Sequence, residues 1–241
     1  MVSMSPTDSP DSPDRSASSD DRDDLDRPVL ERSQSWRDLH VLLANALRHP
    51  DEQFSDAIET GEFEAQLRSL VSTLDVDLAI SLSPPLEESS GLTAAYIDLF
   101  EGRRQPYAPP AESPYRAWYD RDEGGLMNGP AAAEMRQRYR AIDATVPDAY
   151  AADHVALLLE YESLLLEAGD HDAYRSFARS HFEWLPALRR ATDAAAAEAP
   201  VYRWLVVLLD ELFVVLRDRL ELSEPTTADV ERMLGRIGPD G

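Results

Sequence analysis

Apolar residues recur at three- and four-residue steps along most of the chain, which is the spacing of one face of an α-helix. A first helix is predicted over residues 35–47, capped by Ser35 and stopped by Pro50. Further helices are predicted at about 51–60, 63–74, 92–100, 131–142, 153–168, 170–181, 186–200 and 202–220. No stretch alternates as a strand would. The sequence therefore predicts an all-α fold, a single-domain helical bundle of about eight to ten helices over residues 29–241.

Two of these segments are apolar enough to lie in the centre of the bundle. The helix at 153–168 presents a wide apolar face, made of Leu157, Leu158, Tyr161, Leu164 and Leu165. The segment 202–220 is the most hydrophobic in the chain and is apolar over much of its circumference. Asp210 and Glu211 interrupt it, so no stretch reaches the roughly 18 apolar residues of a membrane span. We expect both helices to be buried and the chain to have no membrane span.

The first 28 residues have a different composition, with 8 Asp, 7 Ser and 4 Pro. A segment so poor in apolar side chains cannot offset the entropy of ordering its backbone. We therefore predict a disordered acidic tail over residues 1–28. The N-terminus also lacks a basic region followed by an apolar one, so no export signal is expected and the predicted location is cytoplasmic.

The net charge of −23 comes from 46 acidic and 23 basic residues, and it argues against nucleic acid as a partner. Every basic residue is Arg, and neither Lys nor Cys occurs. This excludes a P-loop, Schiff-base catalysis, thiolate nucleophiles, disulfides and Cys-ligated zinc. The acidity has two interpretations, which are compatible with each other. One is that the protein belongs to a cell that keeps molar salt inside, as a salt-in halophile does. The other is that the surface is acidic because its ligand is basic.

Sequence signatures of catalysis are missing. None of the five histidines has a Glu three residues before it, as di-iron bundles require, and His-Glu-x-x-His does not occur. The Gly-x-Gly-x-x-Gly and Gly-x-Ser-x-Gly motifs are absent as well. We therefore predict a protein that is not an enzyme, with no catalytic residue, no metal ligand and no cofactor.

The Asp153-His154 pair stands at the start of the Leu-rich helix. There an Asp side chain can cap free backbone amides, and a partly buried imidazole can take a proton or donate to a ligand. The plainer interpretation is a helix cap beside an ordinary histidine. Glu160, on the same helix, reads as a solvent-facing charge.

The order of several short motifs is more informative than any one of them. A helix ending in Tyr96-x-x-Leu99-Phe100 runs into a Pro-rich loop at 102–114, which should be ordered and which leads to Glu-Ser-Pro-Tyr. The Asp-His pair and a His-Phe-Glu-Trp-Leu-Pro segment at 181–186 follow. This order resembles the TorD/DmsD/NarJ family of cytoplasmic chaperones for molybdenum-cofactor enzymes of the DMSO reductase class. The resemblance spans about residues 92–216.

The resemblance implies a non-catalytic helical protein that binds the twin-arginine signal peptide, or an equivalent N-terminal segment, of an apo-molybdoenzyme of the DMSO or nitrate reductase class. Binding would hold the catalytic subunit back from export until its cofactor is inserted. A monomer or a domain-swapped dimer is compatible with such a fold. The client-binding residues that the resemblance implies are Tyr96, Leu99, Phe100, Ser113, Tyr115, Asp153 and His154. For Tyr96, Leu99 and Phe100, ordinary core packing is an equally good interpretation.

Two other classes of function stay open. One is a metal-dependent helical hydrolase that uses Asp153, His154 and Glu160 with His171 or His181. The other is a non-catalytic scaffolding subunit of a reductase complex, with the fold but without a peptide groove. Bound metal would distinguish the first from a chaperone, and stable co-purification with an apo catalytic subunit would distinguish the second.

Overall fold

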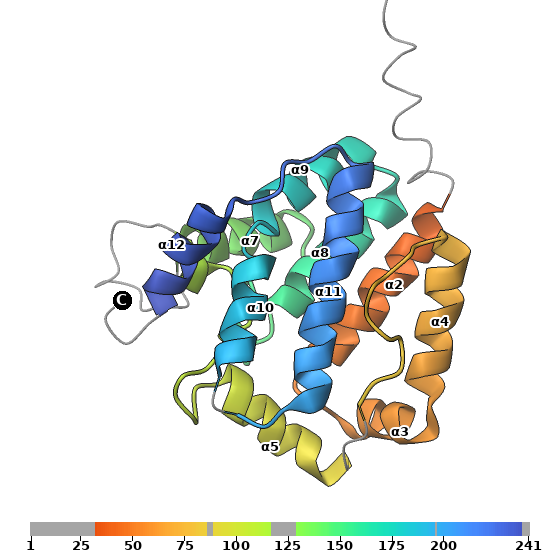
Figure 1. Ribbon diagram of the computed structural model, residues 1–241. Helices are drawn as coiled ribbons and strands as arrows, with labels where there is room; N and C mark the ends of the chain where they lie inside the picture. The colour runs from red at the N-terminus through yellow and green to blue at the C-terminus, as the bar shows by residue number, and fades with distance from the viewer. Residues whose placement is uncertain (1–31, 86–88, 117–128, 196, 238–241) are drawn as a thin grey trace, which may run out of the picture.

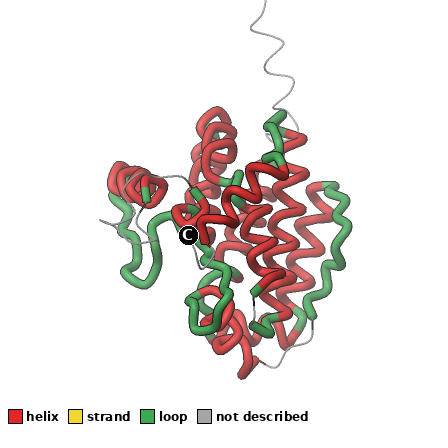
Figure 2. The backbone as a smooth tube through the Cα atoms, turned by 60° about the vertical axis from the view of Figure 1, so that its left-hand side comes forward, coloured by secondary structure: helices red, strands yellow, loops and turns green. Residues whose placement is uncertain are grey.

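The computed structural model describes residues 32–85, 89–116, 129–195 and 197–237, and within them the fold is all-α (Figure 1). Ten α-helices and one short 3-10 helix make up this part of the chain. Figure 2 shows helices and connecting loops with no strand among the described residues. The predicted class and number of helices are therefore confirmed. The predicted tail at 1–28 lies outside the described residues.

Three helices open the described chain: α2 (Ser33–Ala46), α3 (Glu52–Thr60) and α4 (Glu62–Leu74). The α3 helix begins where the Asp51 carboxylate accepts a hydrogen bond from the Phe54 amide at 2.8 Å, as a helix cap does. It ends at Gly61, whose φ of 75° suits glycine. The predicted Ser35 cap is wrong, because α2 already begins at Ser33 and residue 32 provides no side-chain cap.

The remaining elements are α5 (Ser89–Phe100), η1 (Ser113–Tyr115), α7 (Pro130–Ala141), α8 (Val155–Ala168), α9 (His171–His181), α10 (Leu185–Ala194), α11 (Pro200–Arg219) and α12 (Thr227–Ile237). Pro200 was expected to end the helix predicted over residues 186–200, but α10 ends at Ala194 and Pro200 lies in the first turn of α11. Proline is favourable there because the first turn needs no amide donor. The α12 helix was not predicted.

The α11 helix stands at the centre of the bundle, with α8 behind it and α10 beside it (Figure 1). Its Leu205, Leu208 and Leu209 side chains have no exposed surface, which confirms the predicted burial. Two charged residues are buried with them. Asp210 pairs with Arg189 at 3.1 Å, and Arg217 donates to the Phe182 carbonyl at 2.7 Å. Both charges thus have partners, as burial requires.

The buried face of α8 differs from the predicted one in two places. Leu164 is 42% exposed, whereas Glu162 has no exposed surface. The reason is that α8 packs along α2, whose His40 lies 2.9 Å from the Glu162 carboxylate through Nε2. Burial raises the pKa of Glu162, and the His40 side chain opposes that rise. No helix within the described residues is long and apolar enough to cross a membrane.

The two leucines of α8 provide a matched test of this packing. We expect Leu158→Ala, at a fully buried position, to lower the free energy of unfolding by about 2–5 kcal/mol, because it leaves a cavity. Leu164→Ala, the same change on the same helix, should alter it by less than about 0.5 kcal/mol. Denaturant unfolding at one fixed salt concentration measures both. Equal losses would contradict the face assigned to α8.

Candidate functional site

The loop after α5 is joined to the start of α8, about forty residues further along the chain. The Val155 amide donates to the Pro110 carbonyl at 2.8 Å, and the Glu112 amide donates to the Asp153 carbonyl at 3.1 Å. Ala111 and His154 form an isolated antiparallel bridge between these two bonds. We call residues 110–115 and 153–155 the loop–helix junction. The end of the Pro-rich loop is thus joined to the start of α8.

Asp153 holds the junction with its side chain and does not cap α8. Its Oδ2 accepts hydrogen bonds from the Ser113 amide at 2.7 Å and from the Ser113 hydroxyl at 2.5 Å. The carboxylate has no exposed surface, and its other oxygen has no hydrogen-bond partner among the described residues. Burial raises the pKa of Asp153 to about 6, although the two bonds from Ser113 oppose the rise.

His154, and not Asp153, caps the α8 helix. Its Nδ1 accepts a hydrogen bond from the Ala156 amide at 3.2 Å. The hydrogen of the neutral ring therefore lies on Nε2, which is 3.2 Å from the Tyr96 hydroxyl and can donate to it. Burial lowers the pKa of His154 to about 3, so of the two roles considered from the sequence, taking a proton or donating a hydrogen bond, the geometry favours donation near neutral pH.

Tyr115 and Glu112 connect the junction to the segment after α9. The Tyr115 ring stacks on the Trp184 ring, with centroids 5.1 Å apart. Glu112, which has no exposed surface, lies 2.7 Å from His181 Nδ1 and accepts from Arg116 Nε at 2.6 Å. No sequence pattern indicates the Glu112–His181 pair, because 69 positions separate the two residues.

The α5 helix supplies Tyr96, Leu99 and Phe100, all within the core. The Tyr96 ring packs edge to face on Phe100 at 5.1 Å and on Tyr202 of α11 at 5.4 Å. The structure thus brings Tyr96 next to His154, and Ser113 next to Asp153. All seven predicted client-binding residues are at most 4% exposed. In this conformation they are part of the packed interior, and a client cannot reach them from the surface.

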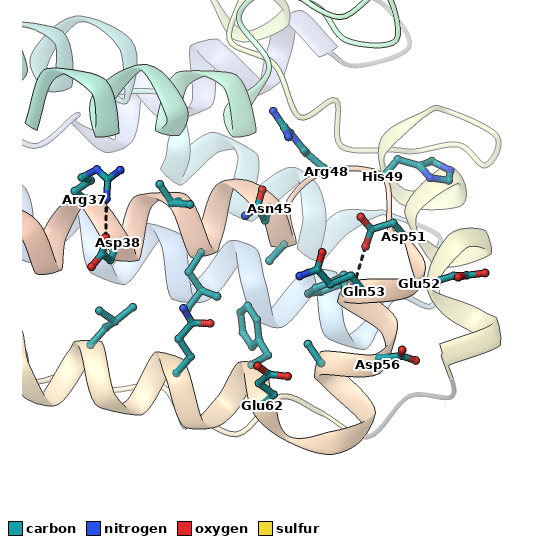
Figure 3. A pocket seen from close by; sticks show the side chains of 18 of the residues that line it. Arg37, Asp38, Asn45, Arg48, His49, Asp51, Glu52, Gln53, Asp56 and Glu62 are labelled. Carbon is teal, nitrogen blue, oxygen red and sulfur yellow. Dashed lines mark hydrogen bonds and ion pairs between the residues drawn. The ribbon is translucent and has the colours of Figure 1, made fainter. Parts of the chain in front are cut away.

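An open groove lies beside the junction, between α2 and α4, with α3 at one end (Figure 3). Its volume is about 1060 Å³. Two residues at its border lie against the candidate site: Tyr150 contacts the junction, and His49 contacts Tyr96. The Tyr150 ring lies 4.8 Å from the His154 ring, and its hydroxyl accepts from the His49 amide at 3.0 Å. The His49 ring lies 5.3 Å from the Tyr96 ring. Sequence reasoning missed both residues, because no motif marks them.

The residues of the hydrolase hypothesis are directed to separate partners. Asp153 binds Ser113, His154 binds Tyr96, and Glu160 pairs with Arg48. Glu160 is therefore half-buried and not simply solvent-facing. Among the residues that the structure describes, no group of three or more acidic or histidine side chains is arranged to hold a metal ion. This geometry gives the hydrolase hypothesis no support.

The raised pKa of Asp153 predicts a pH dependence of stability. The folded protein holds the Asp153 proton more tightly than an unfolded chain with a pKa of 3.8 does, so protonation favours folding. This contribution is complete below about pH 4 and is lost as the pH rises through about 6. The free energy of unfolding of the wild type minus that of Asp153→Asn should therefore fall between these pH values and stay level above them. A difference that rises with pH would contradict the assignment.

Comparison with known proteins adds one finding. No curated protein matches the sequence significantly. The sequence model of the nitrate reductase delta subunit family matches residues 57–190, which is more than half of the chain. The matched span runs from α3 into α10 and includes the whole loop–helix junction. The chain therefore belongs to the nitrate reductase delta subunit family, a family of chaperones for the maturation of molybdoenzymes.

Proposed function

We propose that this protein is a cytoplasmic chaperone that binds the N-terminal segment, or the twin-arginine signal peptide, of an apo-molybdoenzyme of the DMSO or nitrate reductase class. It holds the catalytic subunit until the cofactor is inserted and assembly can proceed before export. The family match over residues 57–190 carries this proposal. The described part of the site adds support, because its buried polar groups are engaged in holding loops together.

The seven predicted client-binding residues act by position in this proposal. Since they are at most 4% exposed, a client contacts them only if the junction opens. Otherwise they affect client binding indirectly, by holding neighbouring surface residues in place. Asp153 fixes the loop through Ser113, and His154 fixes both the first turn of α8 and the Tyr96 side chain. A change at the junction should therefore alter client binding without a direct contact being lost.

The central experiment compares two forms of the catalytic subunit. The chaperone hypothesis expects the protein to capture the cofactor-free subunit and to release it once the cofactor is bound. A scaffolding subunit would instead remain in a stoichiometric complex with the loaded enzyme. Pull-down with each form, analysed by size-exclusion chromatography, separates these outcomes. Equal retention of both forms would contradict the proposed function.

The junction can be tested by the double variant Asp153→Ala, His154→Ala. We expect weaker client binding with unchanged helical content, and a loss of stability greater than the roughly 0.5–2 kcal/mol of a missing cap, because the buried Ser113 amide and hydroxyl also lose their acceptor. The matched control is Asp170→Ala, which removes the cap of α9, where Asp170 accepts from the Ala173 amide at 3.0 Å. The control should lose the stability of one cap and keep its affinity. If the folded double variant binds as tightly as the wild type, the pair is only a structural element.

The charge of the protein predicts how binding responds to salt. At about 1 M salt the Debye length is only about 3 Å, so the diffuse field of a protein with net charge −23 cannot hold a basic peptide. Apolar burial and close ion pairs must do so. We therefore expect the affinity to stay level or to increase from about 1 M to 3 M of a salt with an excluded anion. Calorimetry at both concentrations measures this, and a tenfold loss on folded protein would refute it.

A further inference from the structure

The groove between α2 and α4 has an apolar floor. Phe54 and Phe63 are almost fully buried beneath it, at 8% and 2% exposed. Val41, Leu42 and Leu70 line it while remaining partly exposed. The floor thus presents apolar side chains from three helices in one concave surface. A groove of this kind suits the apolar face of a peptide.

The charges around this floor are unevenly paired. The two arginines that line the groove are already engaged, since Arg37 pairs with Asp38 at 3.0 Å and Arg48 pairs with Glu160. Four lining carboxylates have no ion pair among the described residues, namely Asp51, Glu52, Asp56 and Glu62. In Figure 3, Glu52 and Asp56 lie at the α3 end, and Glu62 lies in the first turn of α4, next to that end. The groove therefore has an excess of unpaired negative charge along one end.

We propose that this groove is where the client's N-terminal segment docks, with its arginines at the α3 end and its apolar residues on the floor. The inference rests on the proposed function and specifies its surface. Carboxylates such as Glu62 accept the paired hydrogen bonds of a guanidinium group, and Phe54 and Leu42 bury the apolar side chains. These short-range contacts can bind the peptide without long-range electrostatic attraction.

Charge also argues against two other occupants. The chain's own N-terminal segment is acidic, with 8 Asp in residues 1–28, and carboxylates such as Glu62 would repel it. A second copy of the chain has 46 acidic and 23 basic residues, so most of the charges that it could bring into contact with the groove carboxylates are like charges. A cationic, apolar segment of a different protein satisfies both the charge and the floor.

The groove lies next to the loop–helix junction and to Tyr96. His49 and Tyr150 form part of its border, and they lie against Tyr96 and His154 respectively. A peptide seated in the groove would therefore press on the side chains that cover the junction. This contact explains how buried residues at the junction can influence a client that does not touch them.

The test uses calorimetry at about 1 M salt, where diffuse charge is screened. The probe is a synthetic peptide that carries an Arg pair followed by a Leu-rich stretch. Glu62→Arg should weaken its binding at least about tenfold, because an acceptor becomes a like charge. The matched control is Glu231→Arg, an exposed position on α12 across the molecule (Figure 1), which should leave binding unchanged.

A second pair of variants tests the floor. Leu42→Gln should weaken peptide binding about tenfold, because it puts an amide on the apolar surface. Leu164→Gln, at a 42% exposed position outside the groove, is its control. Circular dichroism establishes that each variant is folded. If Leu42→Gln does not fold, the Glu62 pair decides the outcome, because Glu62 is exposed and its side chain is not needed for packing.

The outcomes separate the groove from the function. Weaker binding of the peptide and of the apo catalytic subunit by the groove variants alone supports the inference. Wild-type affinity in both groove variants overturns it while the proposed function stands, and the client then docks elsewhere. If the wild type binds neither the peptide nor the apo subunit, the proposed function fails and the inference fails with it.

Discussion

The buried Asp153 carboxylate is the constraint on which the arrangement of the candidate site depends. By accepting two hydrogen bonds from Ser113, it fixes η1 against the start of α8. The neighbouring residues of η1 then reach other helices. Glu112 meets His181 at the end of α9, and the Tyr115 carbonyl accepts from Arg236 of α12 at 3.2 Å. A short loop thus gathers three helices that follow it in the chain, and one carboxylate sets its position.

Much of the fold could be predicted from the sequence because helical periodicity and capping are local. Asp51 and Gly61 mark both ends of α3, as their residue types imply. The burial of Glu162 in place of Leu164 on α8 could not be predicted. It depends on which side of α8 meets His40 of α2, and periodicity carries no information about a neighbouring helix. The α12 helix was missed although it was predictable in the same way, because Val230, Met233, Leu234 and Ile237 recur at helical spacing.

The candidate site was predictable as a family resemblance and not as a surface. The order of the motifs identified the family, and the structure brings Tyr96 to His154 and Ser113 to Asp153. The sequence could not show that these residues are buried, since the same polar residues would suit an open cleft. The groove was missed for a related reason. Its carboxylates look like ordinary surface charge along the chain, and only the packing of α2, α3 and α4 places them around a common floor.

The second oxygen of the Asp153 carboxylate limits the stability of the closed junction. This atom is buried and accepts no hydrogen bond from the described residues, so the closed junction leaves an acceptor of a carboxylate without compensation for its lost hydration. On opening, water would solvate that oxygen and recover part of what closing had forfeited. The closed junction is therefore favoured over the open one by less free energy than it would be if both oxygens of Asp153 accepted hydrogen bonds. Local opening of this kind does not require the rest of the bundle to unfold.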